Sequence, residues 1–127
     1  MIAPGPDWAE LCAEAAVGGL SALAGVPQGR LERDPILRRL LKTVAAQAAA
    51  AARAAGHAVS GDPPRAALSR CRARPRHIHP WLARLRRGRP TGADAVLAPL
   101  LSAARGGPAA ETLRIVGATL RRLEKQP

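Results

Sequence analysis

Apolar residues recur at helical spacing in separate stretches of the chain, and residues that stop helices divide these stretches. The first stretch predicts a helix over about residues 8–24, with Asp7 and Glu10 spaced as a capping box at its start. Gly18 and Gly19 lie in its middle, and each costs about 1 kcal/mol relative to alanine in a helix. We therefore expect another element to approach the helix backbone closely at this pair.

The strongest helix signal lies between residues 34 and 56. Asp34 is a good N-cap, Pro35 suits the first turn, and Gly56 suits a C-terminal stop. The preceding residues 25–29 contain Pro27 and predict a break. The apolar stripe of this helix should consist of Ile36, Leu37, Leu40, Leu41, Val44, Ala48, Ala51, Ala52 and Ala55.

Shorter helices are predicted in the middle of the chain. Asp62, followed by two prolines, starts a helix that should end before Pro75. Residues 80–87 have room for one or two helical turns, which should end at Gly88.

Two more helices are predicted near the C-terminus. Thr91, with Asp94 at the third helical position, should cap a helix that runs to about residue 105 and that Pro99 kinks or splits. The last helix should cover about residues 109–125 and turn one apolar side, which includes Leu113 and Leu120, inward. No apolar stretch alternates with period two, so residues 1–127 are expected to form a single all-α domain.

The composition restricts the core and the cellular context. The chain has two Trp and neither Phe nor Tyr, so Leu, Ile, Val and Ala must fill the core. Cys12 and Cys71 match no disulfide framework or zinc spacing, and we expect both to be buried and reduced. With no signal-peptide pattern and no apolar run of about 18 residues, the sequence favours a soluble cytoplasmic protein without a membrane partner.

The formal charge of +11 is concentrated in one segment, because residues 63–93 contain nine arginines and no acidic residue. We interpret this segment mainly as a solvated basic face, with Arg84, Arg86 and Arg87 as possible anion-binding residues. Binding of nucleic acid is unlikely on this evidence, since aromatic platforms and recognisable RNA-recognition or zinc-finger motifs are missing from the sequence.

Four side chains could be imagined as metal ligands: His57, Cys71, His77 and His79. The flanking arginines disfavour a cation, and no carboxylate or second cysteine stands at ligand spacing. We therefore expect surface histidines and no metal.

One short motif resembles a known family. Gly88, Arg89, Pro90 and Thr91, with Asp94 after them, are similar to the GRPTEID segment of the C-terminal helical domain of ketopantoate reductase (2-dehydropantoate 2-reductase). Other segments follow in the family's order: "LSALAGV" at 20–26, Asp-Pro at 34–35, "RAAG" at 53–56, and Pro108 before the Glu-Thr-Leu at 111–113. The resemblance implies a helical domain of the type that follows the Rossmann domain in 6-phosphogluconate dehydrogenase.

The resemblance also implies a cofactor that this sequence does not provide for. Such reductases bind NADPH on a preceding Rossmann domain, where a GxGxxG turn at a helix N-terminus receives the pyrophosphate. Residues 1–127 contain no such turn. We expect no cofactor in this chain, and NADPH only if a Rossmann-domain partner is supplied.

The family's catalytic positions can be compared with this sequence one by one. With Trp8 aligned to a tryptophan frequent in the family, the proton-donating lysine becomes Glu10 and the two substrate asparagines become Glu14 and Gly18. The substrate serine falls on Pro80, and the glutamate of GRPTEID falls on Gly92. These substitutions remove the catalytic chemistry and predict a pseudoenzyme.

Glu10 and Glu14 allow more than one interpretation. They could form a general acid and base pair, but they are more simply solvated or paired with the arginine-rich segment. We expect a network with Arg84 and Arg87 to fill the vacated cleft.

Three functions follow from these observations. The favoured one is a stand-alone helical domain that does not catalyse a reaction alone and serves as an interaction or oligomerisation module, as a homodimer or with a Rossmann-domain protein. The second is the substrate-binding half of an NADPH-dependent 2-dehydropantoate 2-reductase of pantothenate biosynthesis, completed in trans. The third is a basic nucleic-acid-binding protein, for which affinity should fall steeply with salt.

Overall fold

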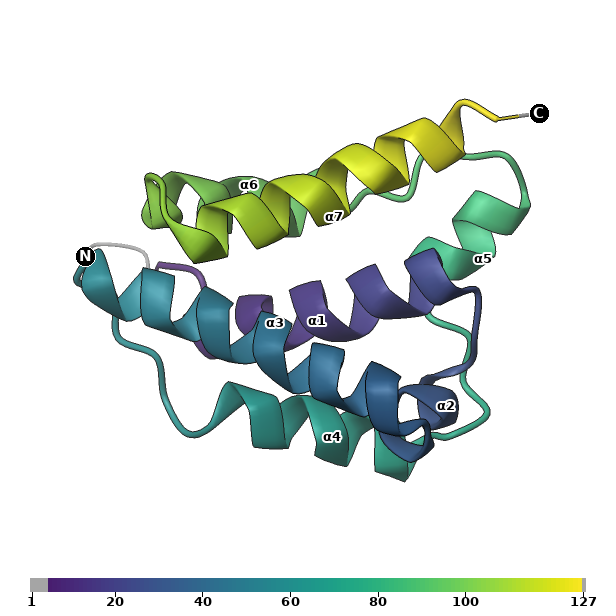
Figure 1. Ribbon diagram of the computed structural model, residues 1–127, viewed down its shortest axis with the longest axis horizontal. Coiled ribbons are helices and arrows are strands. Elements are labelled where there is room, and N and C mark those ends of the chain that lie inside the picture. The colour runs from purple at the N-terminus through teal and green to yellow at the C-terminus, as the bar shows by residue number, and fades with distance from the viewer. Residues whose placement is uncertain (1–4, 127) are drawn as a thin grey trace.

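A computed structural model describes residues 5–126, and within that range the chain forms helices and no strand. The all-α fold predicted from the sequence is therefore confirmed. In chain order, the helices are α1 (Trp8–Ala24), α2 (Gln28–Arg33), α3 (Pro35–Ala54), α4 (Pro63–Ala73), α5 (Pro80–Arg86), α6 (Asp94–Ala104) and α7 (Pro108–Glu124) (Figure 1).

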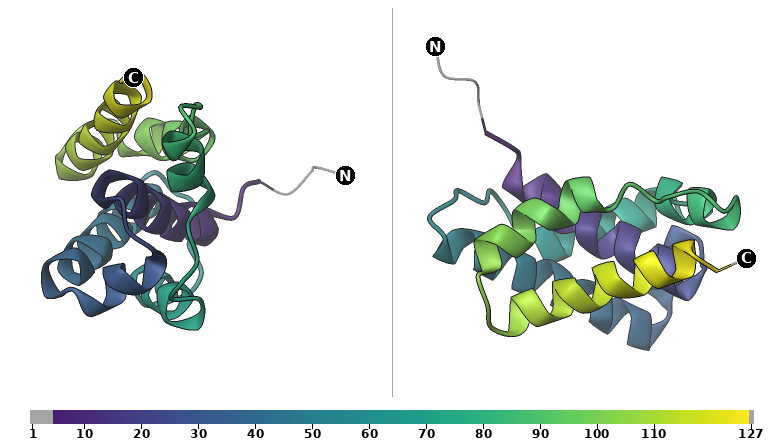
Figure 2. Two further views of the ribbon diagram at one scale, coloured as in Figure 1. Left: turned by 90° about the vertical axis from the view of Figure 1, so that its right-hand side faces the viewer. Right: turned by 90° about the horizontal axis from the view of Figure 1, so that it is seen from above.

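Helix α1 is the centre of the domain and packs against each of the other six helices. One side of α1 joins a core cluster that includes Leu97, Leu113 and Leu120 from α6 and α7. Its other side joins a cluster that includes Leu31 and Leu41 from α2 and α3. Figures 1 and 2 show this arrangement, with α6 and α7 on one side of α1 and α3 and α4 on the other.

Helix α1 has the bounds that the sequence predicts. The Asp7 side chain accepts a hydrogen bond from the backbone N–H of Glu10 at 3.2 Å, and Gly25 ends the helix in the left-handed conformation. The close approach expected at the glycine pair is also confirmed. A Cβ on Gly18 would lie 2.5 Å from the Trp81 ring, and a Cβ on Gly19 would lie 3.0 Å from Val116.

Helix α3 also begins as predicted, because Asp34 Oδ1 accepts hydrogen bonds from two backbone N–H groups of the first turn. The expected apolar stripe is only partly correct. Leu41 is fully buried, whereas Ile36 is 73% exposed and Leu40 is 44% exposed. The buried side of α3 begins at Leu41 and consists mainly of alanines in the second half of the helix. The apolar side chains of Ile36 and Leu40 in the first turns are therefore exposed to solvent.

Helix α2 was not predicted, since the sequence indicated a break at residues 25–29. The reason lies in tertiary contacts: the backbone N–H of Gln28 donates to His77 O, and that of Gly29 donates to Pro75 O. Leu31, which belongs to this short helix, is completely buried. The loop that follows α4 thus fixes a segment whose local sequence favours a turn.

The start of α6 also differs from the prediction. Thr91 does not cap the helix; its N-cap is Ala93, which provides no side-chain hydrogen bond. The helix runs through Pro99 without being split. Helices α4, α5 and α7 agree with their predicted positions to within about two residues, which is the usual uncertainty of helix ends.

Cys12 and Cys71 are both buried and unpaired, as expected. Burial raises the pKa of each thiol to about 11. Among the residues described, no helix has the length and apolar character needed to cross a membrane.

Candidate functional site

The acidic face of α1 is held by one arginine from α4. Arg70 Nη1 donates to Glu14 Oε2 at 2.6 Å, and Arg70 Nη2 donates to both carboxylate oxygens of Glu10 at 2.7 and 2.8 Å. The predicted pairing of these glutamates with the arginine-rich segment is confirmed, but the predicted partners Arg84 and Arg87 are wrong. Arg70 makes the contact because α4 packs directly against α1.

A buried histidine completes this cluster. His79 is 3% exposed, and its Nε2 contacts Glu14 Oε1. Its Nδ1 accepts a hydrogen bond from the backbone N–H of Trp81 at 3.1 Å, so His79 also caps α5. Because Nδ1 is engaged at the start of α5, Nε2 is the ring nitrogen that faces Glu14. The prediction that His79 is a surface histidine is therefore wrong, because α5 begins against the middle of α1.

These contacts determine the charge on Glu14. The hydrogen bond from His79 and the nearby charge of Arg70 lower the pKa of the Glu14 carboxyl, although partial burial works in the opposite direction. Glu14 is consequently an anion at neutral pH with both oxygens engaged. A carboxylate in this state is a poor proton donor.

The position that the resemblance assigns to the second asparagine has no space for a side chain. A Cβ on Gly18 would lie within 2.8 Å of His79 Cε1 and within 2.5 Å of Trp81 Cε3. The serine position, Pro80, is the first residue of α5 and has no hydroxyl. Helix α5 thus occupies the volume beside α1 that a substrate-binding side chain would need.

A hollow of about 240 Å³ remains next to the cluster. Its lining residues are Glu14, Gln28, Arg70, Arg74, His77, His79 and Pro80. Gln28 is 2% exposed and lies in the wall of this hollow. Burial and the charge of Arg74 lower the pKa of the half-buried His77. Sequence reasoning missed Gln28 and Arg70, since only the packing of α2 and α4 on α1 brings them here.

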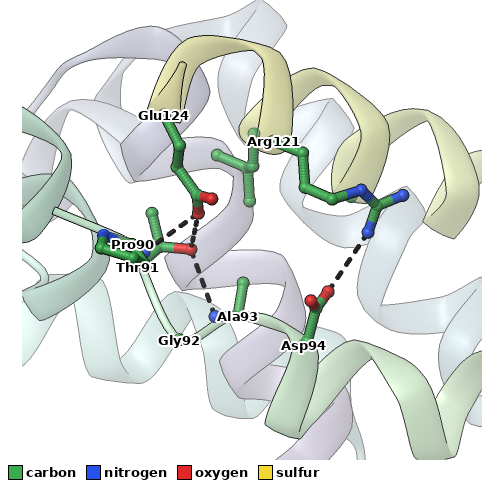
Figure 3. A pocket seen from close by; sticks show the side chains of 9 residues that line it. Pro90, Thr91, Gly92, Ala93, Asp94, Arg121 and Glu124 are labelled. Carbon is green, nitrogen blue, oxygen red and sulfur yellow. Dashed lines mark hydrogen bonds and ion pairs between the residues drawn. The ribbon is translucent and has the colours of Figure 1, made fainter. Parts of the chain in front are cut away.

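The family-like motif at residues 88–91 forms a different site, between α6 and α7 (Figure 3). Thr91 is buried, and its backbone N–H and its Oγ1 both donate to Glu124 Oε1, at 3.0 and 2.7 Å. The Thr91 Oγ1 in turn accepts from the backbone N–H of Ala93 at 3.2 Å. Arg121 Nη1 donates a hydrogen bond to Asp94 Oδ1 at 3.3 Å. These residues and the Thr91 cluster line a pocket of about 120 Å³.

This geometry gives the motif a structural role in the described domain. Gly88 and Gly92 both have φ values in the left-handed region, at 68° and 81°, and Arg89 N donates to Arg84 O. Glu124 from α7 provides the carboxylate that stands beside Thr91, while the motif position Gly92 has none. Glu124 could not be identified from the motif, because it lies 33 residues further along the chain.

Two of the three possible anion-binding arginines make bonds within the domain. Arg84 Nη1 donates to Thr91 O at 2.8 Å, and Arg86 Nη2 donates to Gly25 O at 3.1 Å. Arg87 is exposed at the end of α5. Anion binding by these residues stays a prediction, and Arg84 and Arg86 would have to exchange an existing bond for it.

The remaining candidate ligands are dispersed. His57 is exposed and stacks on Trp8 with ring centroids 3.9 Å apart, far along the chain from His77. Within the described residues, no group of three or more His, Cys, Asp or Glu side chains could hold a metal ion. The same residues form only helices, so this part of the chain offers no strand and glycine-rich turn to fit the pyrophosphate of NADPH.

Comparisons with known proteins agree with the motif and the fold. Residues 6–124 match the family model described as ketopantoate reductase PanE/ApbA C terminal. The structure is similar to that of a PanE/ApbA family ketopantoate reductase from Ralstonia eutropha JMP134, with 28% identity and a TM-score of 0.80. That match covers 92% of this chain and 40% of the reductase, and no curated protein sequence matches. The chain therefore belongs to the ketopantoate reductase C-terminal domain family.

Proposed function

We propose that this domain is a non-catalytic member of its family and serves as an interaction or oligomerisation module. The observation that carries the proposal is the ion-paired cluster in which Arg70 of α4 and His79 before α5 contact Glu10 and Glu14 of α1. It stands where the family resemblance expects a lysine and an asparagine. The polar groups of this face bind one another, which makes the cluster a structural contact between α1, α4 and α5.

The chemistry of a ketone reduction supports this proposal. Hydride transfer to a ketone leaves a developing alkoxide, which needs a proton donor or a positive charge beside it. Glu14, whose pKa is lowered, would instead place a negative charge there and would repel the carboxylate of a keto acid. The arginine that contacts both glutamates, Arg70, is already shared between them.

The module role predicts contact with another protein surface. Three large apolar side chains, Ile36, Leu40 and Ile115, are exposed on α3 and α7. Exposed apolar side chains of this size add to the affinity of an interface when a partner covers them. A homodimer and a Rossmann-domain protein are the partners that we propose, and a cytoplasmic location stays a prediction.

A second candidate is favoured by the hollow of about 240 Å³ beside the cluster. Gln28, Arg74 and His77 could orient a small polar ligand there, so the domain could be the substrate-binding half of a reductase completed by a Rossmann domain in trans. This alternative requires ligand binding without the family's lysine.

Ketopantoate titrated into the chain by calorimetry, with NADPH oxidation followed in parallel, tests both candidates. The proposal predicts neither turnover nor saturable binding. Saturable ketopantoate binding that the substitution Gln28→Leu abolishes would support the second candidate, and NADPH-dependent turnover would overturn the first. Sedimentation at several concentrations then tests the homodimer, which strictly monomeric behaviour at high concentration would contradict.

A further inference from the structure

Arginines from three helices gather at the end of the domain where α2 meets the last turn of α4 and the first turns of α3 (Figure 1). Glu32 of α2 joins two of them, because its Oε1 lies 3.1 Å from Arg72 Nη2 of α4 and 3.6 Å from Arg38 Nη1 of α3. The side chains of these two arginines are still 62% and 44% exposed. Two positive charges thus share one carboxylate and remain open to solvent.

The loop after α4 adds further arginines to the same end. The backbone N–H of Gly29 on α2 donates to Pro75 O at 2.8 Å. A Cβ on Gly29 would lie 2.7 Å from Pro75 Cβ and 3.0 Å from Arg33 Nη2, so the Arg33 guanidinium lies beside Pro75. Arg74 and Arg76, the chain neighbours of Pro75, are both exposed. These contacts join five arginines into one surface, which we call the arginine end: Arg33, Arg38, Arg72, Arg74 and Arg76.

The arginine end has a net positive charge. Within residues 5–126, its members on α2 and in the loop after α4 have no ion pair. Glu32 is the one acidic residue of α2, and Asp34 next to it already accepts two backbone N–H groups at the start of α3. By contrast, Arg84 and Arg86, which the sequence suggested as anion-binding residues, donate to carbonyls within the domain.

We propose that the arginine end binds the phosphate backbone of double-stranded nucleic acid without reading its base sequence. The guanidinium group is planar and always charged, and its paired N–H donors match the oxygens of a phosphate. Contacts with phosphates supply essentially all of the affinity of non-specific binding. The aromatic platforms and zinc-finger motifs that the sequence lacks serve single strands or base recognition, whereas this mode needs only suitably placed cations.

The side chains at the arginine end favour nucleic acid over other partners. The core of a protein interface is depleted of charged residues and needs apolar anchors. Ile36 and Leu40 are exposed, but helical spacing puts them on the opposite side of α3 from Arg38. Stable attachment to a membrane usually adds an apolar face or a lipid anchor to the charge. A second copy, related by a two-fold axis through this end, would bring like charges together.

The test measures binding of the full chain to a fluorescein-labelled DNA duplex of about 20 base pairs, by fluorescence anisotropy at several salt concentrations. Because each phosphate contact contributes about −0.9, the logarithm of the affinity should fall with the logarithm of the salt concentration with a slope of about −3 to −4. The triple variant Arg33→Gln, Arg74→Gln, Arg76→Gln should bind about tenfold or more weakly and should have a slope smaller by about 2 or more.

A matched control removes three positive charges from α7, which lies on the other side of α1 from α4 (Figure 1). Arg114→Gln, Arg122→Gln, Lys125→Gln should weaken binding by less than about threefold and leave the slope unchanged. The double variant Arg74→Gln, Arg76→Gln keeps Arg33 beside Pro75 and should give an intermediate loss. Circular dichroism shows whether each variant is folded.

Three outcomes would overturn the proposal. The first is the absence of measurable duplex binding at low salt. The second is an equal loss of affinity in the two triple variants, which would indicate that net charge alone attracts the duplex. The third is tighter binding of poly-glutamate, or of vesicles of phosphatidylserine with phosphatidylcholine, that depends on the arginine end. Ketopantoate turnover or strictly monomeric sedimentation would count against the proposed function alone and would leave these results unchanged.

Discussion

Replacing Gly18 by alanine should destabilise the domain, even though alanine is the better helix former. The position lies in the interior of α1, where the exchange alone would stabilise the helix by about 1 kcal/mol. The added Cβ, however, would lie 2.5 and 2.7 Å from two carbons of the Trp81 ring and 2.8 Å from His79 Cε1. Both rings are buried and cannot turn away easily.

The expected magnitude follows from these two opposing effects. Overfilling a well-packed core costs about 1–3 kcal/mol, and three contacts with rigid rings place Gly18→Ala at the upper end of this range. After the gain in helix propensity is subtracted, the free energy of unfolding should fall by about 2 kcal/mol.

Gly117 on α7 provides a matched control, because it is also a buried helix-interior glycine. A Cβ there would have Leu97 Cδ1 as its nearest neighbour at 3.5 Å, which is an ordinary van der Waals distance. Gly117→Ala should therefore raise stability by about 1 kcal/mol. Urea unfolding followed by circular dichroism measures both variants, and the midpoints of their thermal transitions should differ by on the order of 10 °C. A Gly18→Ala protein as stable as the wild type would refute the packing of α5 on α1.

Two further predictions concern buried polar groups. The pKa of the Glu14 carboxyl is lowered in the folded state. The stability that ionised Glu14 contributes is therefore present above the ordinary glutamate pKa and is lost as the pH falls through the pKa of the folded protein. The wild type should be more stable than Glu14→Gln at neutral pH, and this difference should shrink below about pH 4. Urea unfolding between neutral and acidic pH tests this, and a constant difference would contradict it. Gln47 Oε1 is buried and has no hydrogen-bond partner within the described residues. Gln47→Met removes this unpaired oxygen and should raise the free energy of unfolding by about 1 kcal/mol, measured by thermal unfolding. A loss of stability would show instead that the oxygen has a hydrogen-bond partner.

Local signals were sufficient to predict most helices of the fold. Asp7 and Asp34 cap α1 and α3, and the two prolines after Asp62 start α4, because these residues act on their own backbone neighbours. The presence of Gly18 in the middle of a helix also predicted the close approach of another element, which is α5 with Trp81. Helix α2 could not be predicted, since its N-terminal N–H groups bind carbonyls of residues 75–77, which are remote in the sequence.

The candidate site was predictable only in its chemistry. The family resemblance implies that Glu10 and Glu14 stand at the positions of a lysine and an asparagine, and the charge pattern predicts an arginine-rich segment as their counter-charge. Which arginine pairs with them depends on how α4 and α5 pack on α1. That packing places Arg70 against the glutamates, buries His79 and directs Arg84 to Thr91 O.

The proposed function depends on the acidic face of α1 acting as a structural ion cluster. Measuring the free energy of unfolding of the double variant Glu10→Lys, Glu14→Asn tests it most directly. The variant leaves Arg70 without either carboxylate and adds a like charge, so we predict a loss of about 2 kcal/mol. The control Glu111→Lys, on the exposed first turn of α7, should lose less than about 1 kcal/mol. Unchanged stability of the double variant, together with a gain of ketopantoate binding, would contradict the claim.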